Sequence, residues 1–89
     1  MSEPTASPFR VGILDGVNYD FASIGDTLPT HSHVEGESHI TICRTGKIKA
    51  FGPGWERVLV PGDVIKFDPN KEHALQAIEA PSRVTNIRY

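Results

Sequence analysis

The four histidines of this 89-residue chain lie in three short stretches: His31 and His33 in an HSH triplet, His39 six residues later, and His73 in the segment FDPNKEHAL. A neutral imidazole is the commonest protein ligand for zinc, copper, nickel and iron. One histidine alone is better explained as a surface or hydrogen-bonded residue. Four imidazoles grouped in this way indicate a metal site.

The elements around these histidines have the pattern of an all-β sandwich or barrel. Glycine and proline recur about every eight to ten residues, and the segments between them are rich in Val, Ile, Phe and Thr. No window of eleven or more residues has a helical period. We expect strands at residues 9–14, 19–24, 30–34, 39–44, 47–51, 57–60, 64–67, 73–78 and 83–87.

Glycine and proline also predict the turns between these strands, because glycine permits positive φ and proline fixes φ. We expect a tight hairpin at Thr45-Gly46 and further turns at residues 52–54 and 61–63. Residues 1–8 are polar and contain two prolines, which predicts a flexible N-terminal arm or one that orders against a neighbouring subunit. Residues 9–89 are expected to form a single domain.

Strand geometry predicts how the histidines point. Side chains alternate between the two faces of a strand, so His31 and His33 project from one face and are suited to chelating one ion. His39 likewise shares a face with Thr41 and Cys43, while the isoleucines between them fill the opposite face.

The spacing of these residues resembles the first motif of the cupins. That motif is a glycine, five residues, HxH, three or four residues, a glutamate, six residues and a glycine. Here Gly25 is followed by five residues and then by His31 and His33. Counting back six residues from Gly46 lands on His39, which therefore stands where the family has its glutamate ligand.

Glu37 is the alternative to His39 as the fourth ligand. It stands at the usual gap of three residues from His33, whereas the gap to His39 is five residues, one longer than the motif allows. We prefer His39, because its strand continues without interruption and Glu37 is beside Gly36 in an expected loop.

The second cupin motif is a glycine, five residues, PxG, two residues, a histidine, three residues and an asparagine. The count from Gly62 reaches His73, but PxG is replaced by residues 68–70 (DPN) and the final asparagine by Ala77. Asparagine tolerates the left-handed conformation of a turn glycine, and the lost asparagine is not a metal ligand in the family. The resemblance covers residues 25–73.

What the resemblance implies is a double-stranded β-helix, a jelly-roll barrel that holds a divalent transition metal (Fe, Mn, Ni, Cu or Zn). The implied ligands are His31, His33, His39 and His73. Four neutral imidazoles leave the charge of the ion uncompensated, which favours a small anionic ligand at any open position. Cupins are often dimers, and a core this small also favours a homodimer. Asp68 is a candidate to orient His73.

Composition and charge narrow the remaining possibilities. Cys43 is the only cysteine, which excludes an intrachain disulfide and indicates the cytoplasm. We expect it to line the pocket or to be a small buried residue. The net charge of −2 is spread without blocks, and no apolar run could span a bilayer, so neither a nucleic-acid partner nor a membrane is expected.

Three functions are compatible with these features. The first is a metal-dependent oxygenase acting on a small enol, diketone or thiol, which needs no protein nucleophile. The second is a non-catalytic module that binds a metal and a small anion. The third is a structural metal domain, which would follow if zinc were closed off by four protein ligands.

Overall fold

The computed structural model describes residues 2–31, 38–68 and 71–88, with the backbone alone at residues 30 and 31. Over these ranges the secondary structure is entirely β, so the all-β class is confirmed, and there is no helix that could cross a membrane. The strands are β1 (Thr5–Val11), β2 (Leu14–Phe21), β3 (Thr27–His31), β4 (His39–Gly52), β5 (Trp55–Leu59), β6 (Val64–Phe67) and β7 (His73–Arg88).

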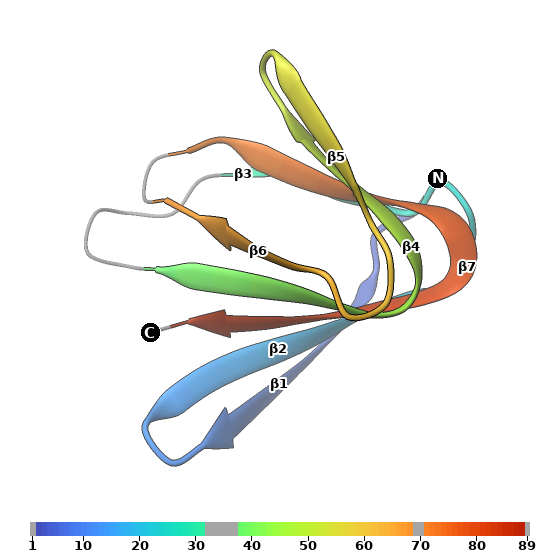
Figure 1. Ribbon diagram of the computed structural model, residues 1–89. Helices are drawn as coiled ribbons and strands as arrows, with labels where there is room; N and C mark the ends of the chain where they lie inside the picture. The colour runs from blue at the N-terminus through green and yellow to red at the C-terminus, as the bar shows by residue number, and fades with distance from the viewer. Residues whose placement is uncertain (1, 32–37, 69–70, 89) are drawn as a thin grey trace.

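Two long strands, β4 and β7, organise the sheet. They pair with each other in antiparallel fashion along most of their length. The first part of β4 also pairs with β6 and its last part with β5, while β7 pairs first with β3 and then with β2, which carries β1 at its outer edge. Both long strands bend, so the sheet folds over into two facing halves (Figure 1).

The expected hairpin at Thr45-Gly46 is wrong. β4 continues through this point, and its register against β7 shifts on both sides of Thr45. Gly46 has a φ of 74°, and a Cβ there would collide with the side chain of Ser82. The glycine therefore serves a bulge that bends one strand, because the segments before and after it both pair with β7.

Part of the expected N-terminal arm belongs to a strand. Thr5–Val11 form β1, which pairs with β2 from Thr5 opposite Asp20 to Val11 opposite Leu14. Pro8 is compatible with this strand because β1 is at the edge of the sheet, where a missing N–H costs no ladder bond.

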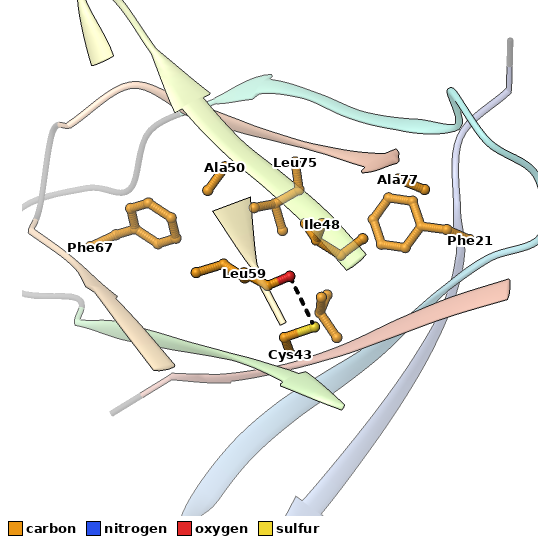
Figure 2. Close-up of a cluster of buried hydrophobic side chains, with 9 residues drawn as sticks. Phe21, Cys43, Ile48, Ala50, Leu59, Phe67, Leu75 and Ala77 are labelled. Carbon is orange, nitrogen blue, oxygen red and sulfur yellow. Dashed lines mark hydrogen bonds between the residues drawn. The ribbon is translucent and has the colours of Figure 1, made fainter. Parts of the chain in front are cut away.

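A hydrophobic core fills the space between the two halves of the sheet (Figure 2). In the first part of β4 the buried residues alternate with half-buried isoleucines, so the expected inward face of His39, Thr41 and Cys43 is confirmed. The buried apolar side chains are Phe21, Cys43, Ile48, Ala50, Leu59, Phe67, Leu75, Ala77 and Val84.

Hydrogen bonds to Asp26 fix the segment before β1. The hydroxyl of Ser2 donates to Asp26 Oδ1 at 2.9 Å, and the backbone N–H of Ser23 donates to Oδ2 at 3.1 Å. The carbonyl of Ser2 also accepts from the N–H of Thr27 at 2.9 Å. The chain start is thereby held against the turn that leads into β3.

Acid is predicted to weaken this anchor. The hydrogen bond from Ser2 is the main cause that lowers the pKa of Asp26 in the folded protein. An aspartate in the unfolded chain has a pKa of about 3.9. The stabilisation is therefore complete above that pH, and it is lost as the pH falls through the lower pKa that Asp26 has in the folded protein. We expect Ser2→Ala to lower the free energy of unfolding at pH 7 and to flatten its acid dependence, measured by urea unfolding at a series of pH values.

Glu3→Gln is the matched control for this experiment, because it removes an exposed carboxylate from the same segment. It should leave the acid dependence near that of the unmodified chain. Identical profiles for the unmodified chain and Ser2→Ala would contradict a role for Asp26.

Candidate functional site

The ends of β3 and β6 and the starts of β4 and β7 lie at one end of the barrel. Three of the histidines are on these strand ends. His31, at the end of β3, is the Cα partner of His73, at the start of β7. His39, at the start of β4, is the Cα partner of Phe67, at the end of β6. The ring of Phe67 stacks on that of His73, with centroids 3.7 Å apart and planes 6° apart. Figure 1 shows the four strand ends on the same side of the molecule.

Part of the expected ligand set lies outside the described residues. This holds for His33 and Glu37, and His31 is described by its backbone alone. Among the described side chains, no group of three or more His, Cys, Asp or Glu residues is placed to hold a metal. The choice between His39 and Glu37 therefore stays a prediction.

His73 is buried in an orientation that suits a metal ligand. It is 2% exposed, and its Nδ1 lies 2.9 Å from the backbone carbonyl oxygen of Lys71. A carbonyl only accepts, so Nδ1 carries the proton and Nε2 keeps the lone pair that a metal would use. The orienting group is thus the carbonyl of Lys71 and not Asp68, whose own carbonyl accepts from the N–H of Lys71 at 3.3 Å.

His39 is also buried, at 7% exposed, and contacts an asparagine from β7. Its Nδ1 lies 3.2 Å from Nδ2 of Asn86, and the hydroxyl of Thr41 donates to Oδ1 of the same amide at 3.1 Å. Neither Asn86 nor Phe67 was a candidate in the sequence. No local motif marks them, because Asn86 meets His39 only through the pairing of β4 with β7.

Three charged residues lie near His39 on β1, β2 and β7. Arg88 is its Cα partner on β7, and Asp15 on β2 accepts from Arg88 at 3.2 Å and from Arg10 at 2.8 Å. The hydrogen bond from Arg10, reinforced by Arg88, lowers the pKa of Asp15, so this carboxyl is ionised at neutral pH. Two guanidinium groups and one carboxylate give this cluster a net positive charge, which Asp68 and Glu72, together with Lys71, offset beside Phe67 and His73.

Cys43 belongs to the apolar core. It is fully buried, and its Sγ donates to the carbonyl oxygen of Leu59 at 3.7 Å (Figure 2) and to that of Thr45 at 3.8 Å. Burial raises the pKa of this thiol, and the charge of Asp63 raises it further. A thiol in such surroundings is a poor nucleophile and a poor metal ligand.

The donor chemistry of the described histidines is compatible with a divalent transition metal. Imidazole nitrogen suits Fe, Ni, Cu and Zn. A metal-bound histidine usually donates its other ring N–H to a carboxylate, a backbone carbonyl or water. His73 has such a bond to a group that can only accept.

Solved structures confirm the fold. No protein-family model matches this sequence, and no curated protein is significantly similar to it. An RmlC-like cupin from Desulfovibrio desulfuricans is 18% identical, with 97% of this chain and 81% of that chain covered and a TM-score of 0.84. This likeness confirms the double-stranded β-helix, the fold of the cupins.

Two further structures are similar. A Cupin_2 domain of an XRE family transcriptional regulator from Enterobacter cloacae is 18% identical, with 96% of this chain and 94% of that chain covered and a TM-score of 0.80. KdgF from Halomonas sp. is 27% identical, with 84% of this chain and 68% of that chain covered and a TM-score of 0.75.

The burial of Cys43 predicts a protected thiol. We expect slow modification by Ellman's reagent at pH 8 in the folded protein, and release of one equivalent of chromophore only after unfolding in guanidinium chloride. The raised pKa lowers the thiolate fraction, and the core blocks access. Cys43→Ser is the blank, and rapid stoichiometric labelling of the folded protein would show that the thiol faces an open pocket.

Proposed function

We propose that His31, His33, His39 and His73 bind one divalent transition metal at the end of the barrel. The observation that carries this proposal is the fixed ring of His73, whose protonated Nδ1 donates to the carbonyl of Lys71, the tautomer that metal binding through Nε2 requires. The backbone of His31 is directly opposite His73. His39 is joined to the same place through Phe67, which pairs with one histidine and stacks on the other.

A small anionic molecule is the ligand that this site would accept. Four neutral imidazoles leave the full charge of the ion uncompensated, which favours a negatively charged ligand. Enolates, diketonates and thiolates are anionic and donate through oxygen or sulfur. Six-coordination would leave two positions for such a ligand.

As an enzyme, the chain would be an oxygenase for a small enol, diketone or thiol. The metal would supply Lewis-acid polarisation and reaction with dioxygen. The residues of this chain would orient the ligands, exclude water through the stacked Phe67 and the core behind it, and attract the anion through Arg88. The non-catalytic alternative uses the same site to bind the metal and anion without turnover.

Loss of a ligand is predicted to abolish metal binding. We expect one metal per chain in the unmodified protein, and His39→Gln and His73→Gln to lose it, measured by elemental analysis after loading. At a free metal concentration of about 100 times Kd, binding should raise the free energy of unfolding by about 2.7 kcal/mol in the unmodified chain alone.

Glu37→Gln is the matched variant, because Glu37 is the alternative ligand. It should keep full occupancy if His39 binds the metal. Retention of metal in His39→Gln with loss in Glu37→Gln would restore the usual carboxylate, and full occupancy in both His39→Gln and His73→Gln would end the proposed site.

Open coordination positions are predicted to be visible with cobalt. The Co(II) protein should give the weak visible absorption of five- or six-coordination, and 2,4-pentanedione, which ionises to a chelating enolate, should change that spectrum while neutral acetone should not. Strong tetrahedral absorption that neither compound changes would indicate a structural site. Oxygen uptake by the Fe(II) protein with 2,4-pentanedione would then separate an oxygenase from a binding module.

A further inference from the structure

A three-residue hydrogen-bond chain, Thr41–Asn86–His39, connects the interior faces of β4 and β7. Thr41 and Asn86 are direct Cα partners, and their side chains are 3.1 Å apart. The amide of Asn86 then reaches Nδ1 of His39 at 3.2 Å. Thr41 is 1% exposed and His39 is 7% exposed, so this chain lies in the interior, where polar groups need defined partners.

The orientation of the amide sets the proton position on His39. In the structure, Nδ2 of Asn86 faces the ring. An amide nitrogen only donates, so Nδ1 of His39 accepts and the proton resides on Nε2. That tautomer cannot bind a metal through Nε2.

Rotation of the amide by 180° would give the opposite tautomer with the same partners. Oδ1 of Asn86 would then accept from Nδ1–H of His39, and Nδ2 would donate to Thr41, whose hydroxyl can either donate or accept. Nε2 would be free of its proton. The hydroxyl at Thr41 is what makes both orientations acceptable.

We infer that Asn86 is the positioning residue of His39 and that metal binding is coupled to rotation of its amide. The inference rests on the proposed metal site. His73 has no such choice, because the carbonyl of Lys71 holds its Nδ1–H in either state. One histidine is thus preset for the metal, and the other changes tautomer on binding without any change in the number of protons.

Nitrogen NMR of the histidine rings tests this inference directly. Long-range ¹H–¹⁵N spectra of the metal-free protein should show the proton of His39 on Nε2 and that of His73 on Nδ1. After addition of Zn²⁺, His39 should carry its proton on Nδ1, while His73 should be unchanged. A metal-free His39 already protonated on Nδ1 would overturn the rotation.

Variants at position 86 test the coupling by calorimetric titration with Zn²⁺. Asn86→Ala should weaken binding by about 10- to 100-fold, the usual effect of removing the group that orients a ligand. Asn86→Asp should bind at least as tightly as the unmodified chain, because a carboxylate only accepts and holds His39 in the binding tautomer before the metal arrives. Unchanged affinity in Asn86→Ala, or weaker binding in Asn86→Asp, would overturn the role of Asn86.

Asn18→Ala is the matched control. Asn18 accepts from Thr85 at 2.7 Å, and Thr85 and Asn86 are successive strand residues whose side chains point to opposite faces. This variant therefore removes a similar bond on the opposite face of β7 and should leave Zn²⁺ affinity unchanged. Absence of Zn²⁺ binding in the unmodified chain would count against the proposed metal site itself. The metal-free NMR spectrum tests the tautomer of His39 separately, because it needs no metal.

Discussion

The antiparallel pairing of β4 with β7 is the interaction on which the rest of the molecule depends. Each strand is long enough to contribute to both halves of the folded sheet, and each bends where the register shifts. The apolar core is enclosed because the two halves face each other. The starts of both strands, which carry His39 and His73, also come to the same end of the barrel for this reason.

The interior is divided between an apolar part and a polar end. Phe21, Cys43 and Ile48 belong to the part without charged groups, whereas His39, Thr41 and His73 are buried polar residues at or near the starts of the strands. A buried polar group is costly unless it is hydrogen-bonded, and each of these three side chains has a hydrogen bond to a named partner.

The sequence predicts local features of the fold well and connections over distance poorly. The strand at Val64–Phe67 and the turns at residues 52–54 and 61–63 are confirmed, because adjacent residues decide them. The hairpin at Thr45-Gly46 is wrong because the same glycine can turn a hairpin or form a bulge, and only the partner strand decides between them. The first strand begins earlier than expected, at Thr5, because β2 offers a hydrogen-bonding partner from Asp20 onward. The polar sequence of residues 5–8 does not by itself predict a strand.

For the site, the sequence by itself determined the residue types and their spacing: four imidazoles, a cupin-like arrangement, and the alternation that turns His39 inward. The tertiary structure alone decided which groups hold those rings. Lys71 offers a backbone carbonyl, which no sequence pattern reveals, and Phe67 and Asn86 reach their histidines across strands. The physical reason is that side-chain alternation follows from local backbone geometry, whereas hydrogen-bond partners and ring contacts depend on the register between strands distant in the sequence.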